Sequence, residues 1–189
     1  MDTLLNEIKS CTHCAQFLVH DPRPVLSANK RCRVAIVGQA PGAVVHKTGI
    51  PWDDKSGQNL RDWLSIDAET FYDKSKVALV PMGFCYPSRG KSGDLPPRPE
   101  CAPKWHDAVF AEMNSLELTL LVGKYAQDYY LEVGKQTLTE TVRAFSNFLP
   151  RHFPLPHPSP RNNIWQAKNK WFASDVIPAL RERVAEALS

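Results

Sequence analysis

The sequence predicts an α/β fold in which helices cover both faces of a small, mostly parallel sheet. Short apolar runs rich in β-branched residues alternate with segments of helical periodicity, and this alternation builds parallel sheets with crossover helices. The 189 residues, 43% hydrophobic and 23% charged, match one globular domain and exclude the disordered and fibrous classes. We therefore expect a single domain over residues 1–189.

The first half of the chain predicts two helices and two strands. Residues 2–9 predict a short helix, and a proline-punctuated loop covers 21–30. The apolar runs 33–38 and 76–80 predict buried strands. Between them, residues 56–66 predict a helix whose apolar side chains share one face, with its first serine as the N-cap.

The second half predicts a long loop, further helices and one or two more strands. Residues 81–99 are too polar and proline-rich for regular structure, and 118–122 predicts a third strand. The stretch 148–160 holds five prolines and contains a short strand at best. Helices are expected over 102–115, 124–133, 137–145 and 163–188.

Charge and hydropathy limit the partners. The net charge of +3 permits binding to a phosphate backbone without requiring it. No run of about 18 apolar residues is present, so no membrane-spanning segment is expected. The N-terminus lacks the apolar core of a secretory signal, so we expect a cytoplasmic protein.

The five cysteines suggest a metal site. Their odd number and the expected reducing compartment argue against a disulfide framework. Cys11 and Cys14 form a C-x2-C pair, and Cys85 and Cys101 lie in a distant segment. Four thiolates can bind an iron–sulfur cluster or tetrahedral zinc, whereas scattered buried cysteines are the plain alternative. Cys32 is expected to be the unpaired one.

Two loops in the first half carry residues suited to ligand binding. The segment GQAPG, residues 38–42, follows the first predicted strand, although a glycine there also suits a simple tight turn. Trp52, preceded by a proline, is a candidate platform for stacking a base, or else a tryptophan that fills the core. Ser56 and Gly57 begin a helix, where they could bind a phosphate or cap the helix.

A third loop contains HPSPRN, residues 157–162. Prolines on both sides of Ser159 fix the backbone beside His157, which catalysis would need and an ordinary loop would not. A single loop histidine is more often inert. This loop, however, follows a predicted strand, as 38–42 and 81–99 do, and such loops meet at the ligand-binding edge of a parallel sheet.

Together these segments resemble the uracil-DNA glycosylase superfamily over almost the full chain. GQAPG, the later HKTGIPW and KSGQNL resemble the first motif of its iron–sulfur branch, family 4. HPSPRN resembles the second motif, and its ending is closer to the single-strand-selective monofunctional branch. The resemblance implies a three-layer α/β/α sandwich with a mostly parallel four-stranded sheet. It also implies a monomeric, monofunctional DNA repair glycosylase that hydrolyses the N-glycosidic bond of uracil or a related damaged base in DNA.

The resemblance also assigns a role to the cysteines. It implies a 4Fe–4S cluster, with zinc less favoured, bound by the segments 11–14 and 85–101. The cluster would hold these segments together in a surface that faces DNA. Its four ligands would be Cys11, Cys14, Cys85 and Cys101.

The catalytic residues implied by the resemblance are His157, His46 and Gln39. His157 is expected to donate to the base oxygen on which negative charge grows, while Trp52 stacks on the flipped base. Ala40 stands where other branches carry a water-activating Asp or Asn, and Gln39 replaces the Glu of family 4. His46 aligns with an acidic residue of family 4 and is expected to orient the water, unless it is a solvated loop residue. Gln39 would be a neutral part of the pocket wall.

The base pocket is expected to include Gly38, Ala40 and Phe84 beside Trp52. Relatives place an asparagine shortly before the third cysteine to read the uracil edge. Here the segment 81–84 reads PMGF and offers backbone groups only. Uracil is therefore implied by the resemblance alone, another damaged base stays open, and backbone amides near Phe84 could substitute.

Contacts with DNA are expected from residues at the two motifs. The serines and helix starts would bind phosphates. Arg161 would wedge into the space that the base leaves, or bind a phosphate, or lie exposed. The expected DNA-binding residues are Ser56, Gly57, Ser159, Arg161 and Asn162.

Two other functions stay open at this level. Gln39, Ala40 and the missing asparagine are compatible with a catalytically inactive iron–sulfur protein that binds nucleic acid. Retention of both Trp52 and His157 argues against that alternative. An iron–sulfur electron carrier would need neither aromatic residue.

Overall fold

The structure, a computed structural model that describes residues 1–189, is built around four parallel strands. In its register, Ile36 pairs with Leu79 and Leu120, and Leu120 pairs with Phe153. The α/β class and the four-stranded sheet are confirmed, and the sheet is wholly parallel. In the order β2-β1-β3-β4, the strands are Val77–Leu79, Val34–Val37, Leu118–Val122 and His152–Leu155.

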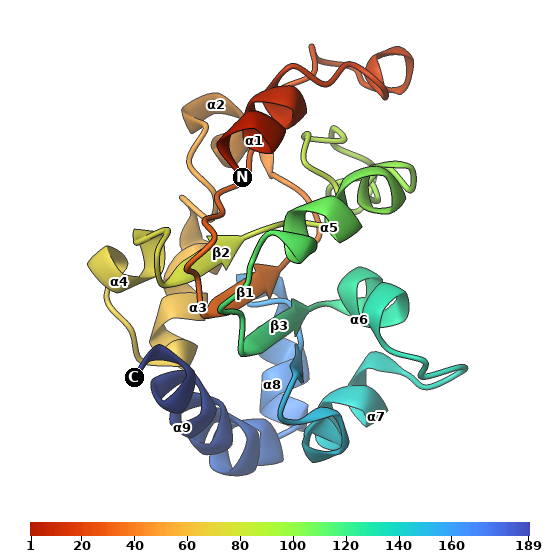
Figure 1. The fold of residues 1–189 in the computed structure, drawn as a ribbon. Helices are drawn as coiled ribbons and strands as arrows, with labels where there is room; N and C mark the ends of the chain where they lie inside the picture. The colour runs from red at the N-terminus through yellow and green to blue at the C-terminus, as the bar shows by residue number, and fades with distance from the viewer.

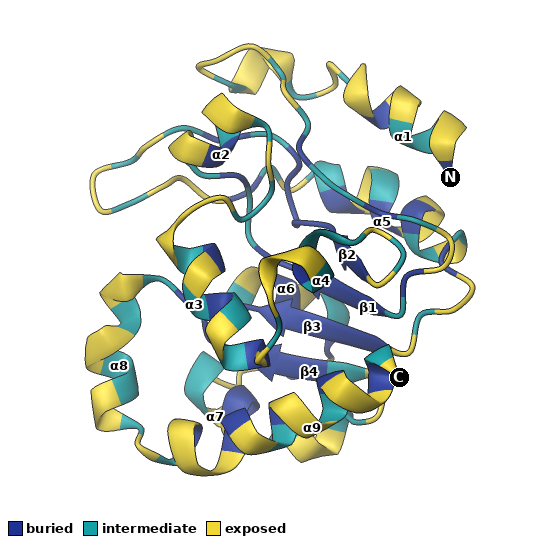
Figure 2. Cartoon of the chain, turned by 90° about the vertical axis from the view of Figure 1, so that its left-hand side faces the viewer, coloured by how far each residue is buried: buried dark blue, intermediate teal, exposed yellow.

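Alternate residues of each strand enter cores on opposite faces of the sheet, which gives the expected three layers (Figures 1 and 2). Ile36 and its register partners contribute to one core, which α3 (Lys55–Leu64) and α9 (Ile177–Leu188) cover. Ala35 and Ala78 face the other core. That second face is covered by α1 (Asp2–Lys9), α5 (Cys101–Ala111) and α6 (Lys124–Tyr130).

Two short helices were not expected from the sequence. Helix α2 (Ala43–Thr48) ends at Gly49, which adopts a left-handed φ of 75°. Helix α4 (Ala68–Tyr72) is capped by Asp67, whose carboxylate accepts from the Thr70 amide at 2.7 Å. Neither is long enough to show the apolar periodicity on which sequence-based prediction depends. No helix in the structure has the length and apolar character needed to cross a membrane.

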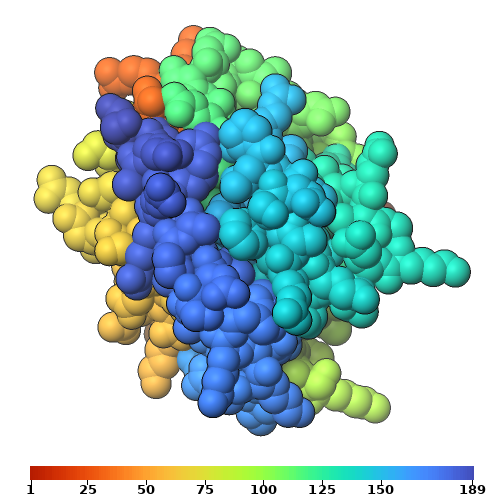
Figure 3. Space-filling view, turned by 90° about the horizontal axis from the view of Figure 1, so that it is seen from below, coloured from red at the N-terminus to blue at the C-terminus, as the bar shows by residue number.

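The predicted terminal helix over 163–188 is divided into α8 (Asn163–Lys168), a π-helical turn (Phe172–Val176) and α9. The Asn169 side chain donates to the Trp165 carbonyl at 2.8 Å and competes with the backbone ladder. Pro178 begins α9 without an amide hydrogen, so the ladder is broken there too. Seen from below, this C-terminal segment (blue) lies between the yellow residues around α4 and the cyan residues around α7 (Leu138–Arg143) (Figure 3).

One buried amide ties the sheet to the loop that follows it. The Gln127 side chain, on α6, donates to the Leu121 carbonyl at 3.3 Å and the Leu155 carbonyl at 2.9 Å. These carbonyls belong to β3 and β4. The bond to Leu155 therefore fixes the start of the HPSPRN loop relative to the sheet.

Candidate active site

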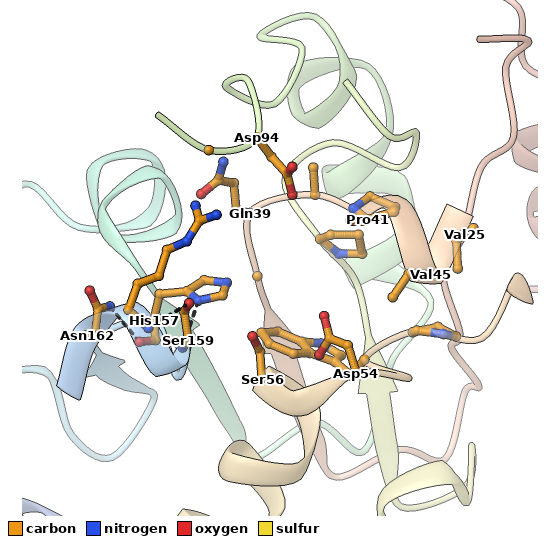
Figure 4. Close-up of a pocket in the computed structure, with 18 residues that line it drawn as sticks. Val25, Gln39, Pro41, Val45, Asp54, Ser56, Asp94, His157, Ser159 and Asn162 are labelled. Atoms are coloured by element: carbon orange, nitrogen blue, oxygen red, sulfur yellow. Dashed lines mark hydrogen bonds between the residues drawn. The ribbon is translucent and has the colours of Figure 1, made fainter. Parts of the chain in front are cut away.

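A cavity of about 480 Å³ lies beyond the carboxyl ends of the strands. Its walls come from the loop after β1, the segment leading into α3, the start and middle of the loop after β2, and the HPSPRN loop after β4. In Figure 4, Gln39 and Asp94 lie opposite Asp54 and Ser56, with His157 on a third side. The sequence-predicted residues brought together here are Gly38, Gln39, Ala40, Trp52, Ser56, His157, Ser159, Arg161 and Asn162.

Trp52 is held in the cavity wall by close packing against two glycines. A Cβ on Gly38 would lie 2.7 Å from Cζ2 of the indole, and one on Gly57 would lie 1.8 Å from the Trp52 carbonyl oxygen. Trp52 itself has a left-handed φ of 57°. The indole lines the cavity and also packs against the core.

His157 lies beside Trp52 in the cavity wall. Their ring centroids lie 5.8 Å apart, with 30° between the ring planes. The Ser159 amide donates to His157 Nδ1 at 3.2 Å, so the proton of the neutral imidazole is on Nε2. Burial lowers the pKa of His157, and the nearby Asp54 carboxylate opposes that shift. The histidine is therefore a neutral ring with one N–H donor.

Two asparagines hold the backbone of the HPSPRN loop. The Asn162 side chain donates to the His157 carbonyl at 2.7 Å, and the Asn59 side chain on α3 donates to the Pro158 carbonyl at 2.9 Å. Ser159 Oγ accepts from the Arg161 amide at 3.3 Å. Ser159 and Asn162, predicted as DNA contacts, thus have structural bonds in the free protein.

The start of α3 differs from its prediction. The N-cap is Asp54 rather than Ser56, and the Asp54 carboxylate accepts from the Gly57 amide at 2.8 Å. Gly57 is buried beneath Trp52, and its amide already has a partner, so it does not present a free donor for a phosphate. Ser56 does line the cavity.

Arg161 and Gln39 both contact the loop that follows β2. Arg161 Nη1 donates to the Ser92 carbonyl at 3.4 Å, and Gln39 Nε2 donates to the Leu95 carbonyl at 3.3 Å. In the free protein Arg161 therefore lies along the cavity wall and holds a loop.

His46 and Phe84 lie outside this cavity, contrary to their predicted roles. The His46 ring, on α2, packs against His20 at 5.3 Å and Tyr86 at 5.6 Å between centroids. Phe84 is 1% exposed. Its amide donates to Cys101 Sγ at 3.4 Å, and its carbonyl accepts from the Val25 amide at 2.7 Å. The backbone of Phe84 is therefore not free to read a base.

The cavity also contains two carboxylates, those of Asp54 and Asp94, that sequence reasoning missed. An aspartate three residues before Gly57 is a typical N-cap signal, which could have identified Asp54. Asp94 lies in a proline-rich loop without periodicity, and no sequence signal indicates it.

The four predicted metal ligands come together at a second cavity. Its lining includes Cys11, Cys14, Cys85 and Cys101. Burial raises the pKa of Cys85 to about 11 and that of Cys101 to about 12. No group of three His, Cys, Asp or Glu side chains is placed to hold a single metal ion. Cys32 is buried in the core at 0% exposure, apart from these four, as expected.

His106 joins the walls of the two cavities. Its Nε2–H donates to the carbonyl of Pro81, a residue of the first cavity, at 3.0 Å. Its Nδ1 accepts from the Tyr130 hydroxyl at 2.6 Å, and the ring stacks on Phe84 beside the second cavity. Burial lowers the pKa of His106 to about 4.

This buried histidine predicts a loss of stability in acid. The unfolded chain takes up a proton below the ordinary histidine pKa of 6.5, but folded His106 does so only near 4. The contribution of neutral His106 to the free energy of unfolding is complete above pH 6.5 and falls between pH 6.5 and 4 by about 1.4 kcal/mol per pH unit. Urea unfolding of wild type and His106→Gln from pH 7 to pH 4.5 measures the difference. If the free energy of unfolding changed equally with pH in the two proteins, the lowered pKa of His106 would be contradicted.

The family comparison covers most of the chain. Residues 27–181 match the model of the Uracil DNA glycosylase superfamily. That span includes GQAPG, the Trp52 segment, the start of α3 and HPSPRN, and it begins after the first two cysteines. The chain therefore belongs to the uracil-DNA glycosylase superfamily.

Proposed function

We propose that this protein is a DNA glycosylase that hydrolyses the N-glycosidic bond of uracil, or a related damaged base, after the base leaves the DNA stack. The observation that carries the proposal is that Trp52 and His157 face one cavity, with ring centroids 5.8 Å apart. An inactive nucleic-acid binder or an electron carrier would not need this pair. Membership in the superfamily supports the same reaction class.

The indole supports binding of a flipped base. Extruding a nucleotide from a duplex costs a few kcal/mol. Stacking the base on Trp52 would recover roughly 1–3 kcal/mol. Because Gly38 and Gly57 pack tightly against Trp52, the platform exists before the base arrives and needs little reorganisation.

His157 supports departure of the base. When the bond between C1′ and the base nitrogen breaks, its electron pair stays on the base and negative charge grows on a base oxygen. The neutral His157 ring carries its proton on Nε2, because Nδ1 already accepts from Ser159. A fixed donor of this kind stabilises the developing charge without reorganisation of solvent.

The proposed choice of base comes from the superfamily, because segment 81–84 brings no side chain into the cavity that could hydrogen-bond to the edge of the base. From the segment 81–84, only Pro81 lines the cavity, and that segment has no side-chain amide. We propose uracil as the first substrate and a related damaged base as the second.

A panel of oligonucleotides tests the function. Each would carry one lesion, uracil or hypoxanthine among them, in single- and double-stranded form. We expect release of the free base, followed by alkali-induced strand cleavage at the abasic site. Binding without base release from every lesion would favour the inactive nucleic-acid binder, and absence of DNA affinity at low salt would favour the electron carrier.

We also propose that the four cysteines hold a 4Fe–4S cluster. Four thiols at one cavity are the donor set of such clusters, and an amide that donates to sulfur, as Phe84 does to Cys101, is a usual partner of a ligating thiolate. The cluster would link the N-terminal segment to the loop after β2. Iron and sulfide analysis of the purified protein tests this, and zinc in their place would contradict it.

His46 gives a separate prediction. Because its ring packs against His20 and Tyr86 outside the cavity, His46→Ala is expected to leave the rate of base release unchanged. Single-turnover release from the best lesion of the panel measures this. A large loss of rate with unchanged folding would restore the water-orienting role expected from the sequence.

A further inference from the structure

We infer that Asp94 is a catalytic residue of the proposed reaction, in which its carboxylate stabilises the sugar cation and takes the proton from the attacking water. This inference rests on the proposed glycosylase function. It places the catalytic carboxylate in the loop after β2 rather than in the GQAPG or HPSPRN motif.

The chemistry favours a negative group in the cavity, and the loop after β1 does not contain one. Loss of the base leaves positive charge at C1′ of the sugar, and water must then lose a proton as it attacks. Residues 38–42 contain no ionisable side chain. A carboxylate that serves this step would therefore come from another segment of the cavity wall.

The structure brings Asp94 to that same loop. A Cβ on Gly42 would lie 3.5 Å from Asp94 Oδ2, so the carboxylate is beside the chain that carries Ala40 two residues earlier. Asp94 and Gly42 both line the cavity, and Figure 4 shows Asp94 on the side opposite Asp54 and Ser56. None of the ion pairs in the structure involves Asp94.

The loop that carries Asp94 has a defined shape. The Leu95 amide donates to the Ser88 carbonyl at 2.9 Å and the Gly90 amide to the Gly93 carbonyl at 2.6 Å, which closes a small hairpin. Arg89 and Asp94 form an antiparallel bridge within it. The carboxylate is therefore presented by a folded turn.

Both sequence motifs hold this hairpin against the cavity. Gln39, from the loop after β1, and Arg161, from the HPSPRN loop, each donate to a carbonyl of the hairpin. A side chain on Gly93 would approach Arg161 Nη1 to 2.8 Å, and its φ of 151° also favours glycine. These contacts flank Asp94. They use the side-chain amide of Gln39 as a donor, a role that a carboxylate at that position could not fill.

The step balances without another reactant. The C1′–N bond breaks, and its electron pair stays on the base while His157 Nε2–H donates a hydrogen bond to it. The water oxygen forms the new bond to C1′, and its proton moves to the Asp94 carboxylate. That proton then passes to solvent or to the released base anion.

Asp54 is the competing carboxylate in the cavity. It is already engaged, because it accepts from the Gly57 amide at 2.8 Å as the N-cap of α3, and it lies close enough to His157 to oppose the lowering of the histidine pKa. These roles place Asp54 beside the base-binding pair rather than beside the loop after β1.

Single-turnover base release by Asp94→Asn tests the inference. We expect the rate to fall by about 100-fold or more. The affinity for lesion DNA should stay equal or increase, because removing a negative charge does not weaken attraction to phosphates. Glu182→Gln is the matched control, since this exposed residue of α9 also loses one negative charge and does not line the cavity. It should keep the wild-type rate.

The outcomes separate this inference from the proposed function. An active wild type whose Asp94→Asn variant keeps its rate would overturn the inference alone. If Asp54→Asn lost activity and Asp94→Asn did not, the catalytic carboxylate would be that of Asp54, and this result would also overturn the inference. A wild type that releases no base from any lesion would overturn both proposals. Partial recovery in Asp94→Glu would support the carboxylate role.

Discussion

Replacement of His157 with asparagine is expected to lower the single-turnover rate of base release by about 10²–10³-fold, the cost of removing one preorganised donor to a developing anion. The asparagine oxygen can still accept from the Ser159 amide, as His157 Nδ1 does at 3.2 Å. The variant therefore keeps the loop in place, but its shorter side chain cannot place an N–H group at the position of Nε2. Rates measured under single-turnover conditions, on the best lesion of the panel, give the result.

Two measurements serve as controls for His157→Asn: the affinity for lesion DNA and the thermal stability. Lesion-DNA affinity and thermal unfolding should match the wild type, because Asn162 and Asn59 hold the loop backbone independently of the ring. A variant that releases base at nearly the wild-type rate would contradict the donor role.

Gly57→Ala is expected to destabilise the protein by about 3 kcal/mol, at the upper end of typical overpacking costs. The added Cβ would lie 1.8 Å from the Trp52 carbonyl oxygen and 2.8 Å from the Trp52 Cβ. A backbone carbonyl cannot rotate away as a flexible side chain can, so Trp52 or the start of α3 must move. We therefore also expect weaker binding of a flipped base. Urea unfolding and affinity for lesion DNA measure the two effects.

Helix propensity alone predicts the opposite sign for this substitution. Alanine in a helix is favoured over glycine by about 1 kcal/mol. Ser56→Ala, at the preceding position of the same turn, is the stability control, because it adds no atom toward Trp52. A Gly57→Ala protein as stable as the wild type would show that Trp52 is not fixed by this contact.

The sheet could be predicted from the sequence because its signal is local. Strand β1 is a continuous apolar run and β3 is interrupted only by Thr119, as expected for strands buried on both faces. The break in the terminal helix was missed because it depends on the Asn169 side chain and on Pro178, two local exceptions within an otherwise helical pattern.

The candidate site was predictable only in part, for a geometric reason. Trp52 and His157 were identified because each lies in a recognisable motif. His46 is near GQAPG in sequence, yet α2 carries its ring away from the cavity. Asp94 is distant in sequence, yet two hydrogen bonds from Gln39 and Arg161 bring its loop to the same wall. Such side-chain bonds to a remote backbone leave no periodic pattern in the chain.

Gln39 and Arg161 hold the hairpin over residues 88–95 through hydrogen bonds to its carbonyl oxygens, at Leu95 and Ser92. Every amino acid supplies a backbone carbonyl, so these two hydrogen bonds do not depend on the side chains at positions 92 and 95. Residues 91 and 92 can therefore be varied in a library while the turn keeps its position, with Gly90, Gly93 and Asp94 held constant. Such a library would change the side chains at the tip of this turn without rebuilding the scaffold beneath.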